Sequence, residues 1–177
     1  TGVVTVVVVV DVGGVYGASN NYATFSKPGD IIDNADAPSV LMDYSEVEFL
    51  LAEAVERGFN VDGTAEEHYN NALRASMEFW GVPEAEITAY LAQPGVTYAT
   101  AGATFREKIG KQKWIALYNR GFEAWTEWRR LDYPVLVAPP DAFSDVPLRY
   151  TYPVSEQNLN TDNYDLAVAK IGADDVS

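Results

Sequence analysis

Apolar residues recur every three or four positions in several stretches of the chain, the spacing that places them on one face of a helix. The first stretch follows Asp43 and stops before Gly58, favoured residues at the start and end of a helix, and predicts a helix over 44–57. The second opens with a capping-box pattern at Thr64 and predicts a helix over 65–80. Because the loop between them is short, we expect an antiparallel helical hairpin.

Two further helices are predicted downstream. Pro83 suits a first helical turn, and a short helix is expected to follow it and to end before Gln93. A second capping-box pattern at Thr104 opens the longest periodic stretch, which predicts one continuous helix over 105–130. Aromatic residues spaced by four, four and three positions would form one stripe along it: Trp114, Tyr118, Phe122 and Trp125.

The flanking segments lack this period. Residues 1–14 are rich in valine without the alternation that would define a buried face, and residues 16–38 are rich in loop-forming Gly, Asn, Ser and Asp. After Pro134, four more prolines disfavour long helices, which predicts an irregular tail. We therefore expect a mainly α protein, with an irregular or extended segment over 1–40 and one helical domain over 41–177.

The predicted helices over 44–57, 65–80 and 105–130 should share one hydrophobic core. Its expected members are Leu50, Leu51, Leu73, Trp114, Phe122 and Trp125. A sugar-stacking surface is the alternative for the aromatic stripe, but rings at this spacing on an amphipathic helix more often pack in a core.

Charge and composition exclude several functions. The chain has 12 Lys and Arg against 26 Asp and Glu, and its net charge of -14 would repel nucleic acids and anionic membrane surfaces. No cysteine is present, which excludes disulfides, thiolate nucleophiles and Cys-ligated zinc. The apolar run Val6–Val10 is far too short to span a bilayer. His68, the one histidine, cannot build a His-based metal site alone, and we expect an ordinary boundary residue.

Several acidic residues are candidates for catalysis or metal binding. Glu123 and Glu127 lie one helical turn apart near Arg129 and Arg130, a pattern more typical of an ion-pair network than of catalysis, and Arg149 is expected to join that network. Three carboxylates spaced by three could suit calcium but lack the EF-hand pattern, so solvated loop acids are expected: Asp30, Asp33 and Asp36. We therefore expect no metal, no cofactor and no enzymatic activity.

The loop from Tyr16 to Tyr22 is the candidate ligand site. It combines two rings for stacking with two amides for directional hydrogen bonds: Tyr16, Asn20, Asn21 and Tyr22. A plain polar turn is the alternative for the same residues.

Three blocks carry a family resemblance: Asp43–Ala54, Gln112–Arg130 and Pro147–Glu156. In order and spacing they resemble the last tetratricopeptide-type helical hairpin and the C-terminal tail of SusD/RagB outer-membrane lipoproteins, over about residues 40–168. The resemblance implies a portion of an α/α superhelix from a surface-exposed protein of Bacteroidetes. It also implies non-catalytic capture of a glycan or similar nutrient, and its delivery to a TonB-dependent, SusC-like transporter.

The chain departs from that family in one respect. Family members begin with a lipidated cysteine and a much longer N-terminal portion, so we expect the membrane anchor and much of the ligand site to lie outside this chain. The resemblance also implies that carbohydrate contacts lie upstream of the 44–57 helix, which favours the Tyr16–Tyr22 loop. Two other classes stay open: a tetratricopeptide-like scaffold for a protein or peptide, and a glycoside hydrolase with paired carboxylates.

Overall fold

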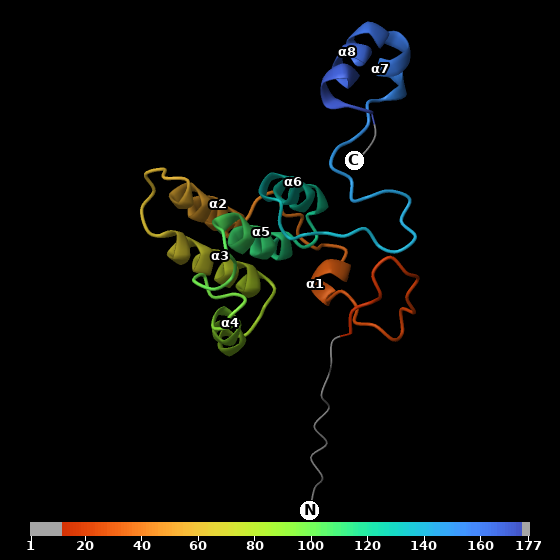
Figure 1. Ribbon diagram of the computed structural model, residues 1–177. Helices are drawn as coiled ribbons and strands as arrows, with labels where there is room; N and C mark the ends of the chain where they lie inside the picture. Colours follow the sequence, from red (N-terminus) through yellow and green to blue (C-terminus); the bar gives the residue numbers. More distant parts are fainter. Residues whose placement is uncertain (1–11, 175–177) are drawn as a thin grey trace, which may run out of the picture. The chain divides into compact units, whose positions relative to one another are not determined.

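The computed structural model describes residues 12–174, and every regular element in that range is a helix (Figure 1). The elements are α1 (Asp30–Asp33), α2 (Tyr44–Glu56), α3 (Ala65–Phe79), α4 (Glu84–Leu91), α5 (Phe105–Ala116), α6 (Gly121–Leu131), α7 (Val154–Leu159) and α8 (Thr161–Ile171). The prediction of a mainly α chain is confirmed. Residues 38–136 form one compact unit, and residues 12–37 together with 137–174 form a second.

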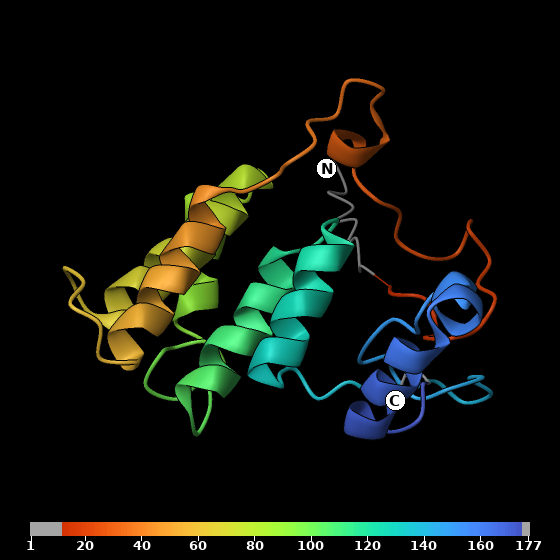
Figure 2. The same cartoon turned by 90° about the horizontal axis from the view of Figure 1, so that it is seen from above.

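The hairpin of α2 and α3 follows from its caps. The Asp43 carboxylate accepts a hydrogen bond from the Glu46 backbone N–H at 2.8 Å, which starts α2, and Gly58 ends it with a φ of 82°. Thr64 and Glu67 form the predicted capping box at the start of α3. The two helices lie side by side in Figure 2, and their bounds agree with the predicted ones within one residue.

The expected helix over 105–130 is wrong as a single element. It divides into α5 and α6 at a turn over 117–120, where Asn119 adopts a φ of 65°. Arg120 lies at the end of this turn, and its buried guanidinium donates to Glu46 at 2.9 Å and to Asp43 at 3.0 Å at the start of α2.

The core of the unit 38–136 lies between α2, α3 and α5. The Tyr69 ring is fully buried, packs edge-on against Phe49 with centroids 6.1 Å apart, and donates its hydroxyl to the Val96 carbonyl at 2.8 Å. Gly110 lets the chain after α6 approach α5, since a Cβ there would lie 2.8 Å from the Cβ of Tyr133. These contacts join segments that are far apart in the sequence.

The predicted core membership is only partly right. Leu73 is buried and Leu51 is half-buried, as expected for core residues. Leu50, Trp114 and Phe122 are exposed, so their assignment to the core is wrong, and Trp125 is only half-buried. The break before α6 separates Trp114 on α5 from Phe122 and Trp125 on α6, so these three residues no longer share one helix face. Leu50 lies on α2, on a face that is exposed irrespective of this break.

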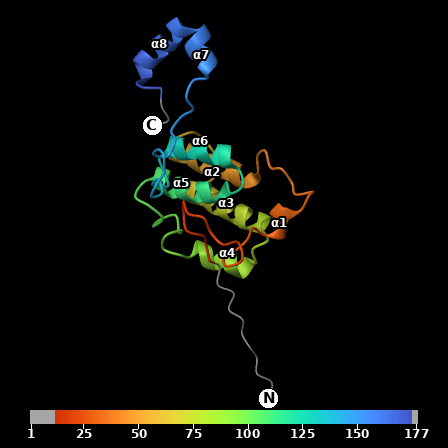
Figure 3. The ribbon, with the colours of Figure 1, turned by 90° about the vertical axis from the view of Figure 1, so that its right-hand side faces the viewer.

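The tail differs from its prediction after Pro153. Residues 137–152 are irregular as expected, but α7 begins directly after Pro153, and α8 forms a short hairpin with it (Figure 3). Proline is tolerated at the start of a helix because its missing N–H has no partner there in any case. Tyr152 and Tyr164 pack edge-on at 5.8 Å and help to hold the hairpin.

Candidate functional site

The predicted ligand loop is held in a defined turn. Gly17 has a φ of 73°, and a Cβ at this position would lie 2.3 Å from the Cβ of Pro139, so only glycine fits. The Asn20 side chain accepts from the Val15 N–H at 2.8 Å and donates to the carbonyls of Val15 and Ala18. The loop therefore has a fixed backbone on which its rings are displayed.

The two amides and the two tyrosines of the predicted site have different surroundings. Asn20 is engaged by the loop backbone, and Asn21 accepts from the Ala23 N–H at 2.9 Å. Tyr16 and Tyr22 are 68% and 67% exposed, and the Lys27 ammonium lies 4.2 Å from the Tyr22 ring centroid. The amides thus shape the loop, while the rings offer surface for a ligand.

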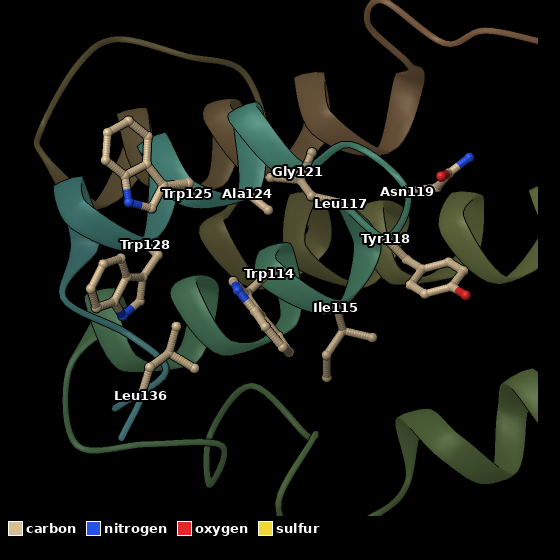
Figure 4. Close-up of a pocket in the computed structure, with 10 residues that line it drawn as sticks. All are labelled: Trp114, Ile115, Leu117, Tyr118, Asn119, Gly121, Ala124, Trp125, Trp128 and Leu136. Carbon is tan, nitrogen blue, oxygen red and sulfur yellow. The ribbon is translucent and has the colours of Figure 1, made fainter. Parts of the chain in front are cut away.

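A second hollow lies on α5 and α6 in the other unit (Figure 4). It has a volume of about 670 Å³ and is mainly apolar, lined by Trp114, Ile115, Leu117, Tyr118, Asn119, Gly121, Ala124, Trp125, Trp128 and Leu136. We call it the aromatic groove. The spacing along the sequence predicts a core position for part of this aromatic set, whereas the break between α5 and α6 leaves it at the surface.

The tryptophans of the aromatic groove are held differently. Trp114 is 39% exposed and projects from α5 on the same side as Tyr118. Trp128 is buried and donates its indole N–H to the Pro134 carbonyl at 2.8 Å. The Arg129 guanidinium lies 4.0 Å from the Trp125 ring centroid, a cation–π distance. The groove therefore has a buried, hydrogen-bonded inner wall at Trp128 and a more accessible outer wall at Trp114.

Of the residues predicted for an ion-pair network, Glu127 and Arg130 take part in one, together with Glu53 and Lys113. Glu127 contacts the fully buried Lys113 ammonium at 3.0 Å and Arg130 at 2.6 Å, and Arg130 also clamps both oxygens of Glu53. Burial alone would raise the pKa of Glu127, but the Arg130 hydrogen bond and the Lys113 charge outweigh it, and the pKa is lowered. Arg149 instead pairs with Asp174 at 2.9 Å.

The pKa of Glu53 is lowered in the same way. Desolvation works against its ionised form, and hydrogen bonds from Arg130 and Arg57 more than offset it. Glu53 and Glu127 therefore stay ionised at neutral pH and act as anchors between helices. Neither has the raised pKa of a general acid.

The structure offers little support for a metal site in the part it describes. Asp36 is exposed, as expected for a solvated loop acid, and Asp33 is exposed but ends α1 instead of lying in a loop. The side chain of Asp30 lies outside the described residues. Within residues 12–174, no three acidic or histidine side chains come together as potential metal ligands. Across the same residues, no helix is at once long and apolar enough to cross a bilayer.

Comparisons with known proteins agree on one family. Residues 9–153 match the model of the SusD-like family described as "Starch-binding associating with outer membrane". The chain is 33% identical to a Bacteroidetes SusD-like protein, AC2a, with a TM-score of 0.69 over 81% of this chain and 30% of that one. It is 30% identical to a chitin-binding SusD homologue from Flavobacterium johnsoniae, with a TM-score of 0.62 over 77% of this chain and 35% of that one.

A third solved structure extends the likeness over nearly the whole chain. A SusD homologue from Bacteroides vulgatus is 26% identical, with a TM-score of 0.71 over 94% of this chain and 40% of that one. No curated protein matches the sequence. The chain thus spans about a third of the length of the solved structures it matches.

Proposed function

The chain belongs to the SusD-like family, and from that premise we propose that it is part of a cell-surface protein that binds a glycan or similar nutrient without cleaving it. The longer protein would be a SusD/RagB-type lipoprotein of the bacterial outer membrane, anchored through lipid. It would deliver its ligand to a TonB-dependent, SusC-like transporter. The family description names starch, and one similar structure is that of a chitin-binding protein, which makes neutral oligosaccharides the first ligands to test.

The observation that carries the proposal in this chain is the pair of exposed rings at Tyr16 and Tyr22 on a braced loop. An exposed ring can stack on the apolar C–H face of a sugar. Because Gly17 and Asn20 hold the loop in place, little conformational entropy is lost when a ligand binds. Asn20 and Asn21 would act mainly by shaping the loop.

Binding without cleavage is supported by the state of the carboxylates near α6. Glycoside hydrolysis needs one carboxyl group that stays protonated at working pH so that it can donate a proton. The pKa values of Glu53 and Glu127 are instead lowered by the cations they contact. These residues therefore suit a structural role.

The test is a titration of the full-length protein with maltoheptaose and with chitohexaose by calorimetry. Replacing both Tyr16 and Tyr22 with Ala should weaken binding about tenfold or more, because each lost stacking contact contributes about 1 kcal/mol. Tyr150→Ala is the matched control, since this tyrosine is 68% exposed. Unchanged affinity in the double variant would remove the loop from the site.

Catalysis is tested separately. Reducing-sugar release from the same two oligosaccharides should stay at the level of the buffer alone. Release above that level, abolished by heat treatment of the protein, would overturn the non-enzymatic reading.

A peptide-binding scaffold is the second candidate, and the aromatic groove is the observation that favours it. An apolar hollow lined by several tryptophans can receive an apolar helix face. Binding of helical peptides that is lost in Trp114→Ala, together with no binding of either oligosaccharide, would favour this candidate over the first.

A further inference from the structure

His68 lies between two groups that can only accept hydrogen bonds. Its Nδ1 is 2.7 Å from a carboxylate oxygen of Glu48 on α2, and its Nε2 is 2.7 Å from the backbone carbonyl of Asp62 in the α2–α3 loop. A carboxylate and a carbonyl offer no proton of their own. Both contacts are satisfied together only when both ring nitrogens carry a proton, so this arrangement requires the imidazolium.

The charges around His68 favour that protonated state. The facing groups are Glu48 from α2 and Glu67 from α3, and Tyr44 and Asn71 hydrogen-bond to Glu48. Burial alone would lower the pKa of His68, but the bonds to Glu48 and Asp62 and the two negative charges raise it above its ordinary value of 6.5. Burial works against the ionised Glu48 as well, yet its hydrogen bonds with Tyr44 and His68 lower its pKa.

The loop backbone lies directly against the imidazole. Gly63 has a φ of 88°, and a Cβ there would lie 3.1 Å from the His68 Nε2. The flanks are secured independently, since Gly58 closes the end of α2 and Thr64 caps the start of α3. The Asp62 carbonyl is therefore the point at which His68 can fasten or release the stretch 59–63.

We propose that His68 is a pH-sensitive latch, which holds the α2–α3 loop while doubly protonated and releases it when Nε2 loses its proton to solvent. Nδ1 keeps its proton because it faces the full negative charge of Glu48. The lone pair exposed on Nε2 then faces the Asp62 carbonyl oxygen, and two acceptors at hydrogen-bond distance repel each other. The loop moves off, while the Glu48 contact and the helices on either side persist.

The latch can be tested on the unmodified chain, because His68 is its one histidine and gives one set of imidazole NMR signals. A titration from pH 5 to 9 should give an apparent pKa above 6.5. Over the same range, the backbone NMR signals of residues 59–63 should shift with the same midpoint, because the Asp62 carbonyl loses its hydrogen bond to the charged imidazole. A pKa at or below 6.5, or loop signals that do not follow the His68 titration, overturns the proposal.

Two variants separate the latch from a general charge effect. Glu48→Gln removes the charge that faces Nδ1, and should lower the His68 pKa and shift loop release to lower pH by the same amount. Glu66→Gln is the control, because it removes one carboxylate from an exposed position of α3 two residues from His68. Equal shifts in both variants would show that overall charge sets the titration, and would refute the latch.

Discussion

The two units differ in how deeply their side chains are buried. Every side chain described as buried lies within 38–136, whereas the described side chains of 12–37 and 137–174 are exposed or half-buried. Both units contain regular helices: Tyr69 on α3 is fully buried, while Leu166 on α8 is mostly exposed. A helical pattern therefore predicts local structure, but only helices with partners supply the burial that stabilises a fold.

The largest expected difference in stability is between two Phe→Ala substitutions, one in each unit. Phe49→Ala should lower the free energy of unfolding by about 3–5 kcal/mol, because the ring is fully buried against Tyr69. Phe143→Ala, at a fully exposed position, should change it by less than about 0.5 kcal/mol. Urea unfolding followed by circular dichroism measures both, and equal losses would contradict the contrast between the units.

The aromatic groove offers a second pair of substitutions to compare, both within the unit 38–136. Trp128→Ala should cost about 3–5 kcal/mol, since the indole is buried and hydrogen-bonded to Pro134. Trp114→Ala should cost clearly less, about 1–2 kcal/mol, because its ring is partly in solvent. Equal losses for Trp114→Ala and Trp128→Ala, measured from urea midpoints, would contradict the difference in burial between the two rings.

The next largest effect on stability is expected in the ion-pair network of Glu53, Glu127 and Arg130. Glu53→Gln should cost about 2–3 kcal/mol, since it leaves the Arg130 guanidinium without its main partner. The figure lies below the range for a fully buried pair because Arg130 is about one-third exposed. Glu78→Gln, an exposed carboxylate on α3, should have almost no effect in the same unfolding assay.

The smallest expected effect is the loss of stability in acid that Glu53 and Glu127 each contribute. Glu53 and Glu127 have pKa values lowered by their cations, so their contribution to stability is present above the unfolded pKa, about 4.3 for Glu, and is lost as pH falls through the folded pKa. Helix content should therefore hold from pH 7 to 5 and decline below about pH 4. Glu53→Gln should flatten that decline, and an unchanged profile would argue against Glu53 as a source of the acid response.

The well-predicted parts of the fold are those with local signals. Asp43, Thr64 and Gly58 mark helix ends through contacts within a few residues, and the α2–α3 hairpin formed where these residues predict it. For the candidate site, the residues of the Tyr16–Tyr22 loop could be selected from composition. The bracing of that loop by Gly17 against Pro139 could not, because those two residues are far apart in the chain.

The division of 105–130 shows why other features escaped prediction. Its spacing of aromatic residues is that of one helix, and no proline interrupts it. Arg120 instead reaches Asp43 and Glu46, more than seventy residues away, and this long-range pairing accompanies a turn at Asn119. The exposed aromatic groove follows from that turn, so it too could not be read from spacing alone.

The sequence by itself determined the helical class, the ends of α2, α3 and α4, the family and the strongly acidic charge, because these depend on residue types and on neighbours within one or two turns. The tertiary structure alone decided which helix faces are buried, where α5 stops, and which acceptors surround His68. The physical reason is that burial and ion pairing depend on groups brought together from distant parts of the chain. Local periodicity carries no information about which partners will meet.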